Sequence, residues 1–171
     1  SACIECVPGR YVNTTGSDAA SDCIACGAGK FVAVTGSDDA SDCIACGVGR
    51  YSNQTGQTSS GDCHQCAYGQ YQGSTGAIGC IDCAVGQYTA PRVSSVLSAC
   101  ALCPVGQYQN VMGMTACIAC ASGTYLPSTG NDAASDCIDC AAGTYLPATG
   151  SDAASDCIAC AVGRFGNQTG Q

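Results

Sequence analysis

DAASDCIDCAAGTYLPATG, which runs from Asp132 to Gly150, decides how this chain folds. It contains a CxxC pair, a Gly-x-Tyr triplet that starts three residues after the second cysteine, and a Thr-Gly turn. Versions of this unit recur along the whole chain, and nothing outside the repeat suggests an active site. Fold and function therefore have to be inferred from the repetition.

The repeat keeps cysteine, glycine and aromatic residues in one phase. Nine CxxC pairs use all 18 cysteines, and five residues after each second cysteine stands a Tyr or Phe. A Gly lies two residues before each of these aromatics, and in most units another Gly lies five residues after it, where a turn with positive φ is expected. We expect one continuous array over residues 1–171, with modules that start near residues 3, 23, 43, 63, 80, 100, 117, 137 and 157.

The composition favours a cross-linked scaffold over a domain with one thick core. The chain has 171 residues, with 18 Cys, 23 Gly, no Trp and 11% charged residues. One module, with two cysteines, one aromatic and about one Ile, is too small to bury a core alone, so it needs covalent cross-links and a stacked neighbour. We predict a small disulfide-rich fold, mostly irregular with short β-strands, arranged as a linear, solenoid-like rod of nine tandem modules of 17 or 20 residues.

Each module is expected to contain an extended segment at Gly-x-Tyr, a turn at Thr-Gly and a short return to the next CxxC. The aromatic side chain should cover the adjacent disulfide. No helix is expected, because Gly and paired Cys interrupt every window.

The fifth module departs from the pattern. Residues 89–100 read TAPRVSSVLSAC and lack the turn glycine. This segment is either a differently folded tip loop or a lateral contact patch for another strand, since clustered exposed apolar residues mark interfaces. The lateral-contact candidates are Val93, Val96 and Leu97, with Met112 and Met114 of the next loop as additions.

The two ends of the chain would continue the repeat if they were joined. A second copy placed directly after Gln171 would have its Cys3 17 positions after Cys157, which is one of the two spacings already in use. We therefore expect these residues to be one period of a longer fibre, in which either the polypeptide continues or separate copies stack head to tail.

The cysteine spacing is compatible with two kinds of chemistry: disulfide bonds, or zinc sites whose ligands are cysteine thiolates. Four-cysteine sites would leave one of the nine pairs over, and thiolates would add negative charge to a chain whose net charge is −8. Asn-x-Thr sequons indicate an oxidising compartment, where disulfides persist. We therefore expect disulfides.

The connectivity of those disulfides is not readable from the sequence alone. A bond inside each CxxC would close a very small loop, and 1–3, 2–4 pairing of neighbouring pairs suits an odd number of pairs poorly. We predict a ladder in which the second cysteine of each pair bonds the first of the next. The bonds are Cys6–Cys23, Cys26–Cys43, Cys46–Cys63, Cys66–Cys80, Cys83–Cys100, Cys103–Cys117, Cys120–Cys137 and Cys140–Cys157, with Cys160 bonding Cys3 of the next copy.

The pattern CxxCxxGxYxxxTGxxxxxxCxxC resembles the ephrin-receptor-like cysteine-rich repeat and, more distantly, the tumour-necrosis-factor-receptor module. The resemblance extends over all nine units. It implies extracellular, rod-like, disulfide-stapled modules with a Cys–GxY–Cys loop, in agreement with the ladder. Similar arrays occur in surface proteins of protists and algae, including ciliate surface antigens. The proline usual after the second cysteine is present only as Pro104, and near-identical copies such as ASDCIAC favour a fibre over a receptor with evolved binding faces.

Three sequons share one position of the module. Asn13, Asn53 and Asn167 each lie two residues past the aromatic, on a segment expected to be extended and exposed. We expect N-glycosylation at all three.

The sequence offers no candidates for catalysis or for a resident metal. The acidic pairs Asp18/Asp22, Asp38/Asp42, Asp132/Asp136 and Asp152/Asp156 supply too few carboxylates for calcium, so they are interpreted as turn chemistry. His64 is the only histidine and is interpreted as a surface substitution. Without a nucleophile–base pair, we expect neither an enzyme nor a cofactor other than covalent glycans.

These observations predict a structural protein that forms an extracellular, glycosylated, disulfide-stapled filament on a cell or flagellar surface. The alternatives are the ectodomain stalk of a surface receptor, adhesin or ciliate-type surface antigen, and a thiolate metal-binding protein. The expected partners are copies of the chain itself, head to tail and in lateral strands. A net charge of −8 and a pI near 4.1 disfavour nucleic acid and anionic membranes as partners, and no membrane insertion is expected.

Overall fold

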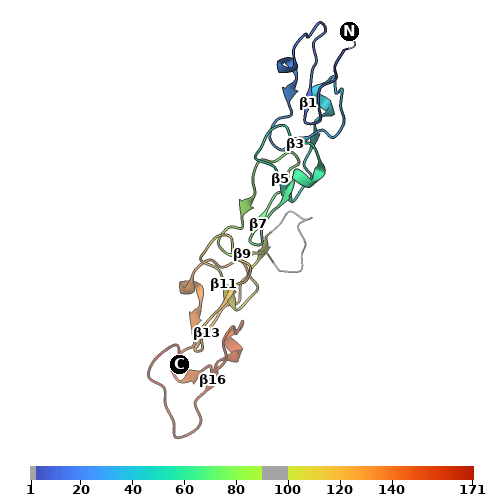
Figure 1. Cartoon of the computed structure of the whole chain (residues 1–171). Helices are drawn as coiled ribbons and strands as arrows, with labels where there is room; N and C mark the ends of the chain where they lie inside the picture. Colours follow the sequence, from blue (N-terminus) through green and yellow to red (C-terminus); the bar gives the residue numbers. More distant parts are fainter. Residues whose placement is uncertain (1–2, 90–99) are drawn as a thin grey trace. The chain divides into compact units, whose positions relative to one another are not determined.

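The computed structural model describes residues 3–89 and 100–171 (Figure 1). The chain forms two compact units. The described part of unit 1 is residues 3–81, and that of unit 2 is residues 82–89 and 100–171.

Each strand among the described residues is two residues long and belongs to a two-stranded antiparallel hairpin. In a hairpin, the last two residues of Gly-x-Tyr pair with the two residues inside the next CxxC, as Tyr11 pairs with Ile24. The expected extended segment and return strand are therefore confirmed. The hairpins are β1 (Arg10–Tyr11) with β2 (Ile24–Ala25), β3 (Lys30–Phe31) with β4 (Ile44–Ala45), β5 (Arg50–Tyr51) with β6 (His64–Gln65), β7 (Gln70–Tyr71) with β8 (Ile81–Asp82), β9 (Gln87–Tyr88) with β10 (Ala101–Leu102), β11 (Gln107–Tyr108) with β12 (Ile118–Ala119), β13 (Thr124–Tyr125) with β14 (Ile138–Asp139), and β15 (Thr144–Tyr145) with β16 (Ile158–Ala159).

Short 3₁₀ helices precede the first cysteine in 20-residue modules, so the expectation of no helix is wrong at these places. They are η1 (Ala20–Asp22), η2 (Ala40–Asp42), η3 (Ser60–Asp62), η4 (Ala134–Asp136) and η5 (Ala154–Asp156). The cause is local, because the last Asp accepts backbone N–H groups from the start of its own turn. Asp42 Oδ2, for example, accepts from Asp38 at 3.1 Å and from Asp39 at 3.2 Å. The acidic segments therefore close turns, and hydrogen bonds from the Ser41 side chain and backbone lower the pKa of Asp39.

The modules whose disulfides close a shorter loop use a buried glutamine in place of this helix. Gln109 Nε2 donates to the Ala116 carbonyl at 2.7 Å, and its Oε1 accepts the Val111 N–H at 2.9 Å. Gln72 makes the corresponding bonds in unit 1, at 2.8 and 3.0 Å. One side chain therefore satisfies the backbone of a loop that has lost three residues.

The turn glycines have the positive φ expected of them. Their φ values lie between 70° and 80° at Gly16, Gly36, Gly56, Gly76, Gly113, Gly130, Gly150 and Gly170. The glycine before the aromatic has a second reason for lacking a side chain. A Cβ on Gly29 would collide with the carbonyl of Gly76, the turn glycine two modules further along unit 1. Unit 2 repeats this approach between Gly106 and Gly150.

Disulfide sulfur supplies most of the small buried interior. Among the described residues, cysteines make up most of the buried apolar side chains, and the others are Val32, Leu126 and Leu146, each directly after an aromatic. Tyr11 packs against Cys26, Val32 and Cys43, so this aromatic covers the disulfide of the following module. The residues after the first cysteine remain open to solvent, as in Ile44, which is 55% exposed.

We expect Gly29→Ala to weaken the stack more than Gly143→Ala. Both glycines have positive φ, where a Cβ costs about 1–2 kcal/mol. Only Gly29 also faces a carbonyl two modules away, whereas nothing lies within 4 Å of a Cβ on Gly143. The readout is amide hydrogen exchange at the N–H that bonds each glycine's carbonyl, Cys46 for Gly29 and Cys160 for Gly143.

Gly27→Ala is the matched control, because Gly27 has no positive φ and open space around its Cα. It should leave the exchange of Cys46 unchanged. Equal losses of protection in Gly29→Ala and Gly143→Ala would show that the contact two modules away contributes nothing.

Replacing Gln109 by Leu should loosen the short loop of its module. The substitution removes the hydrogen bonds to the Val111 N–H and the Ala116 carbonyl, each of which contributes about 0.5–1.5 kcal/mol. Faster exchange of the Val111 amide would report it. Gln107→Leu serves as control and should change little, because Gln107 is a half-buried glutamine on the adjacent strand and does not cap this loop. Equal effects of the two substitutions would refute the capping role.

Candidate assembly interface

Neighbouring modules are joined by backbone hydrogen bonds around the glycine that precedes the aromatic. At the first junction of unit 1, the Gly9 N–H donates to the Val32 carbonyl at 2.8 Å. The Gly9 carbonyl accepts the Cys26 N–H at 2.9 Å. One residue thus bonds the following module with both of its peptide groups.

A second pair of bonds lies on either side of that glycine. The Val12 N–H donates to the Ser37 carbonyl at 3.1 Å, and the Cys6 carbonyl accepts the N–H of the turn glycine Gly36 at 2.9 Å. Tyr11 and Ser37 also form an isolated parallel bridge. The junction therefore uses four backbone bonds and continues one module's strand onto the loop of the next.

The same four bonds recur at three junctions of unit 1 and at four junctions of unit 2, with N···O distances of 2.7–3.2 Å. Each module therefore has two different faces. We call the forward face the one that bonds the following module: the second Cys carbonyl, both peptide groups of the Gly before the aromatic, and the N–H after the aromatic. The backward face is the one that bonds the preceding module. It consists of the N–H of the second cysteine, the carbonyl of the residue after the aromatic, the N–H of the turn glycine and the carbonyl of the residue after that glycine.

A disulfide crosses each of these seven junctions, and an eighth, Cys66–Cys80, links the fourth module to the first cysteine of the fifth. Each links the second cysteine of one module to the first cysteine of the next, with Cα–Cα distances of 5.5–5.8 Å. The eight pairs are those of the ladder: Cys6–Cys23, Cys26–Cys43, Cys46–Cys63, Cys66–Cys80, Cys83–Cys100, Cys103–Cys117, Cys120–Cys137 and Cys140–Cys157. Cys3 is free and exposed, and Cys160 is free and half-buried. A thiolate zinc site would require these sulfurs as free thiolates, whereas sixteen of them are in disulfides.

Arginine adds a side-chain bond to the junction, a feature that the sequence analysis missed. Arg10 donates to the Cys23 carbonyl at 2.7 Å, and Arg50 donates to the Cys63 carbonyl at 2.9 Å. Both arginines directly precede the aromatic, and both acceptors are the first cysteine of the next module. The signal was present in the sequence as basic residues in phase, since Arg164 occupies the same position.

The three sequon asparagines, Asn13, Asn53 and Asn167, are exposed. Glycosylation of these residues stays a prediction. Val93, Val96 and Leu97 lie outside the described residues, so their proposed lateral contact stays a prediction as well. Met112 and Met114, the additions to that patch, are 59% and 40% exposed.

Within residues 3–89 and 100–171, no group of three or more His, Cys, Asp or Glu side chains is placed to hold a metal ion. His64 is exposed on β6 and lies against Tyr51, with ring centroids 5.8 Å apart. In this same part of the chain, no helix has the length and apolar character needed to cross a membrane.

Residues 92–137 match the family model described as tyrosine-protein kinase ephrin type A/B receptor-like. The described part of this segment contains the disulfides Cys103–Cys117 and Cys120–Cys137. The segment is similar to an ephrin-receptor-like cysteine-rich repeat, and the tandem disulfides elsewhere are consistent with an array of such repeats. The comparison with curated proteins gives no match. The repeat and its disulfides fit an extracellular protein.

Alkylation of the unreduced, unassembled chain of residues 1–171 should label two cysteines, Cys3 and Cys160, because the other sixteen are in disulfides. Reduction in denaturant should raise the label count to 18. Peptide mapping by mass spectrometry gives both counts, and a chelator added before labelling is the control. Labelling of further cysteines only after chelation would instead indicate metal-bound thiolates.

Proposed function

We propose that this chain is a structural protein whose modules build an extracellular, glycosylated, disulfide-stapled filament, as a cell-surface or flagellar-appendage fibre. The observation that carries the proposal is the uniform junction. Every complete junction within a unit uses the same four backbone bonds, and a disulfide crosses each one. A chain built for repetition of one contact is suited to extension along a line.

The chemistry of the exposed residues also supports a mechanical role. Side chains that could act in catalysis are sparse, because the chain has one histidine and 11% charged residues. The cross-links that take the place of a core resist separation of the modules, since each closes a loop of 14 or 17 residues. Glycans on Asn13, Asn53 and Asn167 would cover exposed segments and limit proteolysis.

The second candidate is an ectodomain stalk of a surface receptor or adhesin. The match of residues 92–137 to the ephrin-receptor-like family favours it. A stalk and a filament share the module structure and differ at the end of the array. A stalk ends in a different domain, whereas a filament continues with the same repeat.

Electron cryo-microscopy of the native material separates the two candidates. A filament should show an axial repeat equal to nine modules and density for sugar beside the three asparagines. Enzymatic removal of N-linked sugar is the matched control and should remove that density alone. Single particles of finite length that end in a different domain would contradict the filament and support the stalk.

A further inference from the structure

The two terminal modules leave complementary halves of the junction unused. On the backward face of the first module, the Cys6 and Gly16 N–H groups and the Val12 and Ser17 carbonyls bond no other described residue. These four groups correspond to those that every following module within a unit uses to bond its predecessor.

The last module presents the opposite set. The Cys160 carbonyl, both peptide groups of Gly163 and the Gly166 N–H bond no other described residue. These groups form the forward face of this module. The backward face of the first module and the forward face of the last module each have two N–H donors and two carbonyl acceptors. Each donor of one face matches an acceptor of the other by its position in the module.

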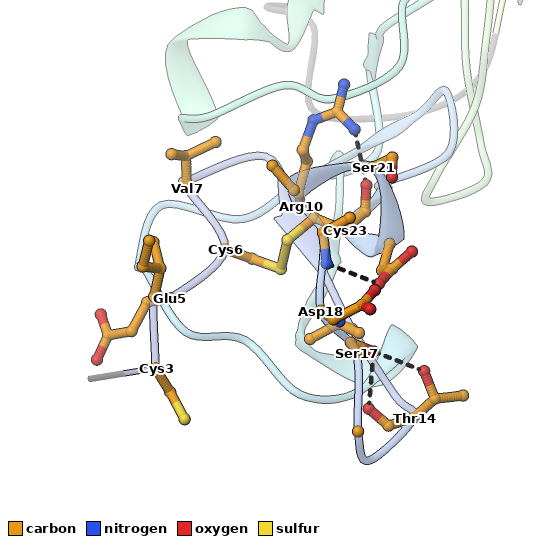
Figure 2. Close-up of a pocket in the computed structure, with 16 residues that line it drawn as sticks. Cys3, Glu5, Cys6, Val7, Arg10, Thr14, Ser17, Asp18, Ser21 and Cys23 are labelled. Atoms are coloured by element: carbon orange, nitrogen blue, oxygen red, sulfur yellow. Dashed lines mark hydrogen bonds between the residues drawn. A yellow bond between two sulfur atoms is a disulfide. The ribbon is translucent and has the colours of Figure 1, made fainter. Parts of the chain in front are cut away.

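The cavity on unit 1 lies on this unused backward face. It has a volume of about 960 Å³, and Cys6, Val12, Gly16 and Ser17 are among the residues that line it. Figure 2 shows the Cys6–Cys23 disulfide in its wall and Cys3 apart from that disulfide.

The aromatic of the last module lacks the cover that the first aromatic has. Phe165 is 87% exposed, whereas Tyr11 packs on the disulfide that follows it. A docked module would supply Phe165 with an equivalent apolar contact.

The glycines at the two faces have the open space that a docked module would fill. Gly16, Gly143 and Gly163 have nothing within 4 Å of an added Cβ, unlike Gly29 and Gly106, which abut a turn glycine two modules on. If the first module of a second copy docked on the last module, the Gly16 carbonyl of that copy would approach Gly143. Docking would also set Gly16 against Ala159, in the way that a Cβ added to Gly56 would lie 3.6 Å from the Cβ of Ala25.

We propose that the forward face of the ninth module binds the backward face of the first module of a second copy of this sequence, whether that copy continues the same polypeptide or is a separate chain, and that Arg164 donates to the carbonyl of that copy's Cys3. This inference rests on the proposed head-to-tail assembly and names its contact. Arg164 is exposed and occupies the position of Arg10 and Arg50, both of which bond the first cysteine of the next module. Three acidic side chains, Glu5, Asp18 and Asp22, line the receiving cavity against one basic side chain, Arg10, so the charge there favours a further cation.

Docking places Cys160 beside Cys3 of the second copy. In continued numbering that cysteine is residue 174, so the separation is 14, as in Cys66–Cys80 and Cys103–Cys117. A small-molecule disulfide such as oxidised glutathione completes the bond by thiol–disulfide exchange. The two protein thiols lose two electrons and two protons and become one disulfide, while the glutathione disulfide is reduced to two thiols.

Sedimentation velocity of the oxidised chain of residues 1–171, over a concentration series in glutathione buffer, tests the contact. The unmodified chain should form a series of oligomers, and non-reducing peptide mapping should find Cys160 joined to Cys3. A Cys3→Ser/Cys160→Ser double variant should associate reversibly. In that background Arg164→Glu should weaken association about tenfold or more, because an acid replaces the donor facing an acidic cavity.

Arg164→Gln is the matched control, because glutamine occupies this position at Gln70, Gln87 and Gln107. It should weaken association by less than Arg164→Glu does. A chain that stays monomeric, linkage through other cysteines, or equal association of the two Arg164 variants would overturn the contact. A native filament built from chains that do not associate in this assay would refute this inference and leave the proposed function standing. End-to-end association of the chains without a native filament would support this contact and refute the proposed function.

Discussion

The fold depends on a backbone junction that a module is unable to make alone. At every complete junction within a unit, the glycine before the aromatic bonds the next module with both of its peptide groups, and the second cysteine's carbonyl accepts the N–H of the next turn glycine. Unpaired backbone groups in a buried position cost about 1–3 kcal/mol each, so an isolated module would lose several such contributions at once. A disulfide across the same junction reduces the freedom of the unfolded chain. Together these interactions make the neighbour part of each module's own stability.

Much of this arrangement could be predicted from the sequence, because equivalent residues recur at the same position of each module. The regular spacing of cysteines, glycines and aromatics led to the short hairpins, the turns at glycines such as Gly36, and the pairing of each second cysteine with the next first cysteine. Phase identifies equivalent positions, but it does not show which modules touch. The approach of Gly29 to Gly76 was therefore missed, because it joins modules two apart whose residues carry no paired signal.

Local hydrogen bonding explains the other differences. The 3₁₀ helices arise because an aspartate such as Asp42 folds back onto two nearby N–H groups, a device that hydrophobic periodicity does not reveal. Gln72 and Gln109 serve the shorter loops, and they could have been found, since glutamine follows the aromatic in both of these modules. The exposed isoleucines, by contrast, show that an apolar residue in phase need not be buried in so thin a fold.

Amide hydrogen exchange of the turn glycines, resolved by NMR in dilute protein, tests the junction most directly. Within the units, the amides of Gly36, Gly56, Gly76, Gly113, Gly130, Gly150 and Gly170 donate to the preceding module, whereas that of Gly16 has no acceptor among the described residues. The account predicts slow exchange at these seven amides and fast exchange at Gly16. Fast exchange at all of them, or equal protection of Gly16 in the monomer, would contradict it.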